Sequence, residues 1–217
     1  MIKAVLFDFD GTLYDTSEGI FNTANYTMRA LGFPECHDEK QLSKFIGPPL
    51  RDCFRIVFGI KDDETVELCF NTYKKEYDIS GIDKLKVYPE IDPLLDELKK
   101  SSIPLGVCTL KGQELVERIL INENRVFDFV KGTDFKGKIT KAISIQSAVD
   151  YFNLDANEVL MIGDTLNDLE GSLKVGTHFA AVSWGFGFNK TSEIKYGRLV
   201  STKEDILKYI EEINDGS

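Results

Sequence analysis

Short apolar runs alternate with segments of helical periodicity over most of the chain. Runs without polar alternation, such as residues 159–162, are typical of strands buried on both faces of a parallel sheet. In chain order, the predicted strands are 2–7, 104–108, 127–130, 159–162 and 179–182, and the predicted helices are 91–100, 114–121, 141–152, 166–174 and 203–213. Repeated units of this kind predict an α/β fold, a Rossmann-like parallel sheet with helices on both faces and right-handed crossovers.

Residues 16–83 follow a different pattern, with helices and no persuasive strand. Apolar side chains at helical spacing mark helices over residues 16–31 and 63–77, and two adjacent prolines between them are placed to begin a further helix. The pattern predicts an α/β core domain over residues 1–15 and 84–217, with a small helical cap domain inserted after the first strand. Such an insert would lie over the end of that strand as a lid. The alternative is that these helices simply pack on the sheet.

Composition and charge limit the classes of partner. The 217 residues include 42% hydrophobic and 29% charged side chains, which is ordinary for a globular protein. The formal net charge is −10, with 36 acidic against 26 basic residues, and this argues against a nucleic acid or an anionic membrane as partner. A small phosphorylated metabolite stays compatible, because a metal ion and a few local cations can reverse the field within one cleft.

The cysteines and the chain start indicate a compartment. Four cysteines occur without a Cys-x-x-Cys pair and in apolar surroundings, so we expect reduced packing residues. No basic segment with a long apolar run precedes the first strand, and no run approaches a membrane span. We therefore expect a soluble, cytoplasmic protein, whose oligomeric state the sequence does not set.

The first predicted strand ends in two carboxylates. Asp8 and Asp10 follow the strand directly, and Gly11 then breaks it. Two charges at the end of a buried strand are costly unless a cation or a phosphoryl group meets them. One carboxylate can attack phosphorus while the other moves a proton, with Mg²⁺ offsetting the negative charge. The alternative is a simple strand-to-helix turn in which Asp15 caps the next helix.

Polar side chains follow two further strands. Thr109 and Lys111 end the strand 104–108, while Asp164 and Asp168 follow the strand 159–162. Because ligands of parallel sheets bind beyond the carboxyl ends of the strands, we expect these residues near Asp8 and Asp10. Thr109 can bind a phosphate oxygen or be a turn residue. The two aspartates can act as a metal ligand with a supporting carboxylate, or cap a helix.

Lys141 occupies an unusual place for a lysine. Its spacing to Ile145 and Ala148 puts it on the apolar stripe of its helix, at the N-terminal end, where a cation opposes the helix dipole. Such a position calls for an anion. Lys138 is a competing candidate, because the helix boundary is uncertain by a few residues. The alternative for Lys141 is a surface lysine whose stem covers apolar side chains.

Taken together, four pieces resemble the haloacid dehalogenase superfamily in its phosphatase branch. The pieces are Asp8-x-Asp10-Gly11-Thr12, then Thr109, then Lys141, then Gly163-Asp164-x-x-x-Asp168. The helical insert resembles the type-one cap of that superfamily. Residues 45–50 and 182–185 are similar to phosphoglycolate-phosphatase-like and nucleotidase-like members.

The resemblance implies a hydrolase that works through an aspartyl-phosphate intermediate. Asp8 would be the nucleophile, and Asp10 the general acid and then the general base. Thr109 and Lys141 would bind the phosphoryl oxygens. Mg²⁺ would be held by the Asp8 side chain, the Asp10 backbone carbonyl and Asp164, with Asp168 in support. In this sequence Leu110 stands where many relatives carry serine or asparagine, which removes one side-chain contact with phosphate.

The leading hypothesis is therefore a Mg²⁺-dependent phosphatase of a small phosphomonoester. Two alternatives stay open, a phosphosugar mutase of the same superfamily and a phosphate-binding regulatory module without turnover. The substrate is not specified among phosphoglycolate, nucleotides, sugar phosphates and pyrophosphate. Arg51, beside the prolines of the cap, either meets the distal part of the substrate or is a solvated arginine at a helix start.

Overall fold

The computed structural model describes residues 1–134 and 138–216 and divides the chain into two compact units. One unit consists of Met1–Tyr14 and Val87–Ser217, and the other is Asp15–Lys86. The chain passes between them twice. At these crossings it forms β2 (Tyr14–Asp15) and β3 (Lys86–Val87), which pair with one another.

The larger unit is built on a six-stranded sheet with the strand order β5-β4-β1-β6-β7-β8, in which every neighbouring pair is parallel. The strands are β1 (Ala4–Phe7), β4 (Leu105–Gly112), β5 (Phe129–Thr133), β6 (Val159–Gly163), β7 (His178–Val182) and β8 (Arg198–Val200). The predicted Rossmann-like α/β fold is thus confirmed. The sequence pattern missed β8, because three residues at a sheet edge carry no recognisable period.

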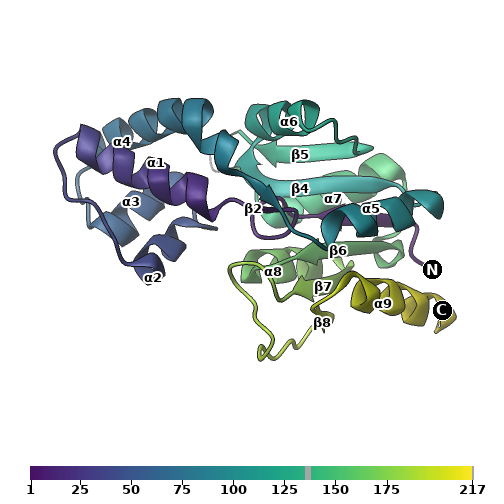
Figure 1. The fold of residues 1–217 in the computed structure, drawn as a ribbon. Helices are drawn as coiled ribbons and strands as arrows, with labels where there is room; N and C mark the ends of the chain where they lie inside the picture. The colour runs from purple at the N-terminus through teal and green to yellow at the C-terminus, as the bar shows by residue number, and fades with distance from the viewer. Residues whose placement is uncertain (135–137, 217) are drawn as a thin grey trace. The chain divides into compact units, whose positions relative to one another are not determined.

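Helices cover both faces of this sheet. Figure 1 shows α5 and α9 in front of the strands and α7 behind them, and α7 packs against α8. The helices of this unit are α5 (Ile91–Lys100), α6 (Gln113–Asn122), α7 (Lys141–Phe152), α8 (Leu166–Val175) and α9 (Lys203–Asp215), with a 3-10 turn, η4 (Ala156–Glu158). None of the helices in the described part of the chain has the length and apolar character of a bilayer span.

Local signals explain where these helices begin and end. The Thr140 side chain accepts a hydrogen bond from the Ile143 N–H and so caps α7, and Thr202 with Asp205 forms a capping box at α9. Asn153 ends α7 in the left-handed conformation. β1 is fully buried at the centre of the sheet, so the residues that follow it emerge in the middle of the carboxyl edge.

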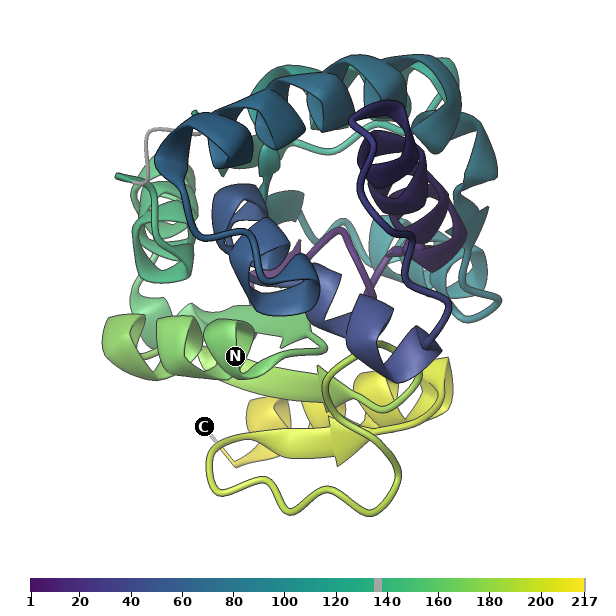
Figure 2. The same cartoon turned by 90° about the vertical axis from the view of Figure 1, so that its left-hand side faces the viewer.

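The smaller unit is helical. Its helices α1 and α4 pack against one another, and α3 packs against α4 (Figures 1 and 2). Phe45, Phe54 and Tyr73 form a shared aromatic core, with ring centroids 5.0 to 6.1 Å apart. The elements of this unit are α1 (Ser17–Ala30), α2 (Glu39–Leu42), η1 (Ser43–Phe45), α3 (Leu50–Phe58), α4 (Asp63–Glu76), the π-helical turn η2 (Tyr77–Gly81) and η3 (Ile82–Lys84).

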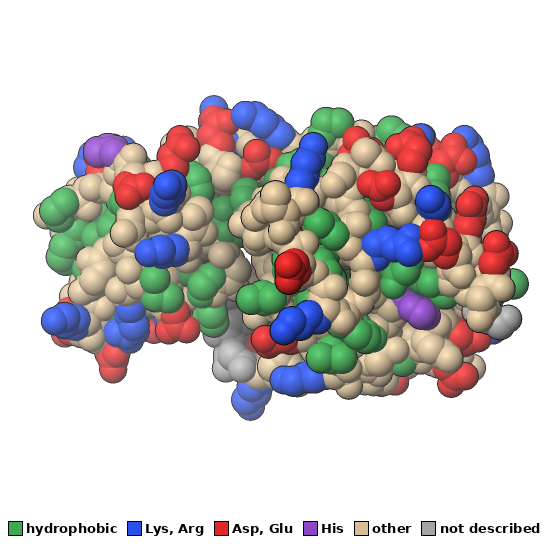
Figure 3. Space-filling view, turned by 90° about the horizontal axis from the view of Figure 1, so that it is seen from below, with side chains coloured by type: hydrophobic (Ala, Val, Ile, Leu, Met, Phe, Trp, Pro, Cys, Tyr) green, Lys and Arg blue, Asp and Glu red, His purple; other side chains and the backbone are tan. Residues whose placement is uncertain are grey.

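The surface carries charges of both signs. On the face drawn in Figure 3, Lys and Arg side chains stand among Asp and Glu side chains. The exposed ion pairs of the molecule include Lys100 with Glu97 and Arg55 with Asp63. Pairs of this kind contribute only about 0–1 kcal/mol each to stability.

Candidate active site

The turn after β1 brings the first carboxylate to the carboxyl edge of the sheet. The Asp8 N–H donates to the carbonyl of Ile162 at 2.9 Å, which continues the pairing of β1 with β6. Gly11 then adopts a φ of 82°. A Cβ at Gly11 would lie 2.2 Å from Oδ2 of Asp164, so both the backbone conformation and the close approach require glycine there.

Three of the four predicted acids meet at this edge. Asp8, Asp164 and Asp168 are buried, and one carboxylate oxygen from each lies within 4.8 Å of the others. Asp8 is the residue after β1, Asp164 is the residue after β6, and Asp168 lies in the first turn of α8. More than 150 residues of chain separate Asp8 from the other two. Asp10 is not part of this group, although it lies only two residues from Asp8.

Lys141 lies against two of these carboxylates. Its Nζ is 2.7 Å from Oδ1 of Asp8 and 2.7 Å from Oδ1 of Asp168, and it donates to the carbonyl of Cys108 at 2.9 Å. Gly171 leaves room for the lysine stem, because a Cβ there would lie 2.8 Å from Lys141 Cγ. Lys138, by contrast, is exposed. Of the two candidate lysines, Lys141 is the one that meets the acids.

Asp168 has two roles at the start of α8. Its Oδ2 accepts hydrogen bonds from the N–H and hydroxyl of Thr165, at 3.0 and 2.7 Å, in a capping box. Its Oδ1 forms the ion pair with Lys141. The helix cap and the contact with Lys141 therefore use different oxygens of the same carboxylate.

Asp164 is held by a loop after β7 to which the sequence pattern assigns no role. Its Oδ2 accepts the N–H of Phe186 at 2.8 Å, and its Oδ1 accepts the hydroxyl of Thr12 at 3.3 Å. A Cβ at Gly185 would lie 2.3 Å from both Asp164 Cβ and the carbonyl oxygen of Gly11. The Trp-Gly-Phe-Gly run at residues 184–187 was the available signal, since closely spaced glycines mark close backbone approach.

Burial and mutual repulsion make this acid cluster electrostatically unfavourable. Burial raises the pKa of Asp8 to about 6, and Lys141 only partly opposes this shift. Burial also holds the pKa of Asp164 well above its usual range, with further contributions from Asp168 and Asp8. Burial acts to lower the pKa of Lys141, yet Asp168 and Asp8 together hold it above its ordinary value. One lysine does not offset three buried carboxylates.

The donor set fits a divalent cation. Carboxylate oxygens are the ligands that hard cations such as Mg²⁺ prefer, and a 2+ charge would relieve the repulsion that raises the pKa values of Asp8 and Asp164. Because Oδ1 of Asp168 is paired with Lys141, Asp8 and Asp164 are the residues best able to supply ligand oxygens. The buried cluster is therefore suited to a metal ion.

Thr109 and Asp10 lie beside the cluster rather than in it. Thr109 is 1% exposed and directly follows Cys108, whose carbonyl binds Lys141. The Thr109 hydroxyl accepts the Lys111 N–H at 3.1 Å. The Asp10 carboxylate forms an ion pair with Lys111, whose Nζ lies 2.9 Å from Oδ1. Lys111 stood at the predicted strand end without an assigned role.

Arg51 is engaged within the helical unit. Its Nε and Nη2 both donate to the carboxylate of Glu67, and its guanidinium lies 3.7 Å from the centroid of the Phe70 ring. A bidentate carboxylate partner already occupies its donor fork. Arg51 is thus a paired, partly exposed arginine at the start of α3.

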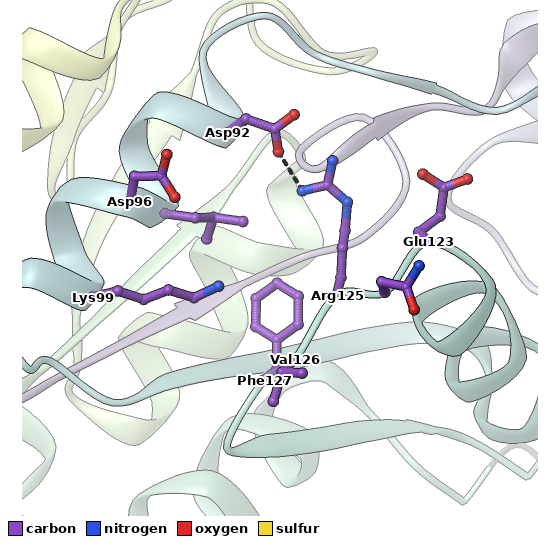
Figure 4. A pocket seen from close by; sticks show the side chains of 9 residues that line it. Asp92, Asp96, Lys99, Glu123, Arg125, Val126 and Phe127 are labelled. Carbon is purple, nitrogen blue, oxygen red and sulfur yellow. Dashed lines mark hydrogen bonds and ion pairs between the residues drawn. The ribbon is translucent and has the colours of Figure 1, made fainter.

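A hollow in the larger unit lies apart from the acids. Its volume is about 240 Å³, and it is lined by α5 and by residues 123–127 (Figure 4). Arg125 reaches across it to Asp92 and also lies 5.7 Å from the ring of Tyr14. None of the predicted site residues lines this hollow, so it is separate from the site chemistry.

Comparisons with known proteins agree with this geometry. A family model described as haloacid dehalogenase-like hydrolase matches residues 5–182. A 5'-nucleotidase from Pseudomonas aeruginosa is 32% identical over 196 residues, which span 88% of this chain and 86% of that protein. A phosphoglycolate phosphatase from Aquifex aeolicus is 30% identical over 189 residues, which span 85% and 86%.

A solved structure is similar over nearly the whole chain. It is a haloacid dehalogenase-like family hydrolase from Streptococcus pneumoniae, with a TM-score of 0.86 and 30% identity, and the match covers 96% of this chain and 98% of that one. The family model runs from the second residue of β1 to the last residue of β7. The resemblance stated from the motifs is confirmed, and the chain belongs to the haloacid dehalogenase-like hydrolases.

Proposed function

We propose that this hydrolase is a Mg²⁺-dependent phosphatase of a small phosphomonoester, with Asp8 as the nucleophile. The observation that carries the proposal is the contact of Lys141 Nζ with Asp8 Oδ1 at 2.7 Å, inside a buried group of three carboxylates at the edge of a parallel sheet. A lysine held there orients the carboxylate and offers positive charge to an incoming phosphate.

In the first step, a carboxylate oxygen of Asp8 attacks phosphorus, and the bond from phosphorus to the leaving oxygen breaks. Asp10 gives its proton to that oxygen, so that the alcohol leaves neutral. In the second step, Asp10 takes a proton from water as the water oxygen attacks the aspartyl phosphate. Phosphate leaves and Asp8 is restored. Thr109 and Lys141 bind the phosphoryl oxygens in both steps.

A bound Mg²⁺ would stabilise the negative charge that spreads over the transferred group. Asp8 and Asp164 would hold it, with the Asp10 backbone carbonyl as a further ligand and with Asp168 in support through Lys141. The names of the two curated relatives make a nucleoside monophosphate and phosphoglycolate the first substrates to test.

We also propose that residues 16–83 act as a cap domain for a core of residues 1–15 and 84–217. The two crossings of the chain lie in the paired strands β2 and β3, which would serve as the hinge. Small-angle scattering with and without Mg²⁺ and a phosphate analogue such as orthovanadate tests this role. Closure predicts a smaller radius of gyration with the analogue.

Phosphate release from a panel of nucleotides, phosphoglycolate, sugar phosphates and pyrophosphate tests the main proposal. We expect release with Mg²⁺, loss with chelator and loss in Asp8→Asn. The matched control is Asp96→Asn, which changes an exposed acid of α5 outside the cluster. Release that survives in Asp8→Asn would contradict the nucleophile.

The same panel separates the two alternatives. Conversion of one sugar phosphate to its isomer without free phosphate, followed by ³¹P NMR, would indicate the phosphosugar mutase. Saturable binding without any turnover would indicate the phosphate-binding regulatory module.

A further inference from the structure

We propose that Lys111 is a positioning residue for Asp10, holding its carboxylate away from the acid cluster in the orientation from which it exchanges protons with the leaving oxygen and with water. The inference rests on the proposed function. It assigns to each carboxylate of the Asp-x-Asp pair its own lysine, Lys141 for Asp8 and Lys111 for Asp10.

The first support is the pair itself. Lys111 Nζ lies 2.9 Å from Asp10 Oδ1, and the side chains are only 7% and 20% exposed. Among the described residues, Lys111 is the one side chain that forms a hydrogen bond or ion pair with Asp10. Without it, Asp10 would face the negative field of Asp8, Asp164 and Asp168 with no cation of its own, and would turn toward solvent.

The second support is the backbone that presents Lys111. The pairing of β4 with β5 shifts register between Cys108 and Gly112, and the Lys111 N–H turns back onto the Thr109 hydroxyl. An irregularity of this kind re-aims a side chain beside an active site. The predicted strand ended at residue 108, so this re-aiming lies beyond the part that the apolar pattern marks.

The third support is that neighbouring groups lock this backbone in place. A Cβ at Gly132 would lie 2.6 Å from the carbonyl oxygen of Lys111, so β5 passes in close contact with it. The side chain of Gln113 accepts the Gly132 N–H at 2.5 Å and donates to the carbonyl of Val130 at 3.2 Å. A backbone held in this way keeps the lysine within reach of Asp10.

The fourth support comes from the residue between the two acids. Phe9 is fully buried and stacks on Tyr14 with ring centroids 4.6 Å apart. Lys111 Nζ lies 5.6 Å from the centroid of the Phe9 ring, so the ammonium also gains a cation–π contact. Phe9 thus anchors the segment that carries Asp10 and contacts the lysine that pairs with it.

The test uses the leaving group as the readout. An aryl phosphate such as p-nitrophenyl phosphate needs little protonation of its leaving oxygen, whereas an alkyl phosphate needs a proton donor. In Lys111→Met, which keeps an unbranched apolar stem but removes the ammonium group, we expect kcat to fall by about 10–100-fold for the best alkyl phosphate. For p-nitrophenyl phosphate we expect a change within a few fold. Lys111→Arg should restore most of the lost kcat for the alkyl phosphate. Lys174→Met changes an exposed lysine of α8 and should leave kcat for both substrates unchanged.

A double-mutant cycle completes the test. It adds Asp10→Asn and the double variant that combines Asp10→Asn with Lys111→Met. If Asp10→Asn shows the leaving-group selectivity and the double variant adds nothing to it, the positioning role is supported. Equal losses for both substrates in Lys111→Met, or a raised KM with unchanged kcat, would overturn it and indicate a direct contact with substrate phosphate. If Asp10→Asn itself shows no selectivity, the proposed function of Asp10 fails instead. Near-ultraviolet circular dichroism of each variant checks that the fold is kept.

Discussion

Lys141 and Asp8 form an almost fully buried ion pair, with Nζ and Oδ1 2.7 Å apart and side chains 4% and 10% exposed. The pair joins the first residue of α7 to the residue after β1. Because a second carboxylate, Asp168, lies at the same distance from Nζ, the lysine neutralises part of a larger negative charge. The same contacts therefore bear on stability and on chemistry.

Replacing Lys141 should lower both the stability of the fold and the phosphatase activity. In Lys141→Met, buried Asp8 and Asp168 lose their cation, and removal of one partner from a buried pair costs about 3–5 kcal/mol. We expect a loss of about 3 kcal/mol in metal-free protein at neutral pH, because protonation of the carboxyls relieves part of the cost. Urea denaturation measures it. Lys138→Met is the control and should stay within about 0.5 kcal/mol of wild type. A larger effect at Lys138 than at Lys141 would contradict the assignment.

The raised pKa of Asp8 predicts a pH dependence of stability. Its folded-state pKa of about 6 exceeds the ordinary value of 3.8, so the folded protein binds this proton more tightly than the unfolded chain does. Protonation of Asp8 therefore favours the folded state. This contribution to the free energy of unfolding is fully present below pH ~4 and is lost as the pH rises through about 6. A pKa difference of about 2 corresponds to roughly 3 kcal/mol.

The comparison of metal-free wild type with Asp8→Asn isolates this effect. Between pH 4 and 7, we expect the variant to gain stability relative to wild type by up to about 3 kcal/mol, with part of the change shared with Asp164. Denaturant titrations at several pH values give the difference. If the difference in free energy of unfolding between variant and wild type stayed constant over this range, the pKa of Asp8 would not be raised in the folded protein.

Mg²⁺ should stabilise the folded chain. Binding to the native state alone at 100 times the Kd adds about 2.7 kcal/mol. For a chain of this size we expect an increase in Tm on the order of 5 °C, measured by differential scanning calorimetry. Asp164→Asn should abolish most of the increase, whereas Asp96→Asn should retain it. An equal increase in Asp164→Asn would place the ion elsewhere.

Gly185→Ala should displace Asp164 without replacing any of the proposed site residues. The added Cβ would lie 2.3 Å from Asp164 Cβ and from the Gly11 carbonyl oxygen, so the loop or the aspartate must shift. Overpacking of this kind costs about 1–3 kcal/mol, and we expect weaker metal binding as well, measured by calorimetric titration.

Gly176→Ala is a matched control for backbone strain. Gly176 has a φ of 90°, but among the described residues a Cβ there would meet only Ala156, at 3.9 Å. The control should lose stability while it retains metal affinity. If both variants bind the metal as wild type does, the Gly185 contact does not position Asp164.

Much of the site could be predicted because it depends on local patterns. The apolar runs predicted the strands, and the rule that ligands bind at the carboxyl ends of parallel strands placed Asp8 and Asp164 at one edge. Lys141 stood out because a lysine on the apolar stripe at a helix start calls for an anion. Each of these features can be recognised within a short stretch of sequence, without knowledge of contacts between distant segments.

What the sequence by itself determined is therefore the α/β sheet and the identity of the acids at its edge. Only the tertiary structure decided that Asp10 turns away to Lys111, 101 residues along the chain, and that the Phe186 N–H holds Asp164. It also decided that Asp168 shares Lys141 with Asp8. The physical reason is that these contacts depend on a strand irregularity and on close backbone approaches at glycine, which are set when distant segments pack together and leave no periodic signal along the chain.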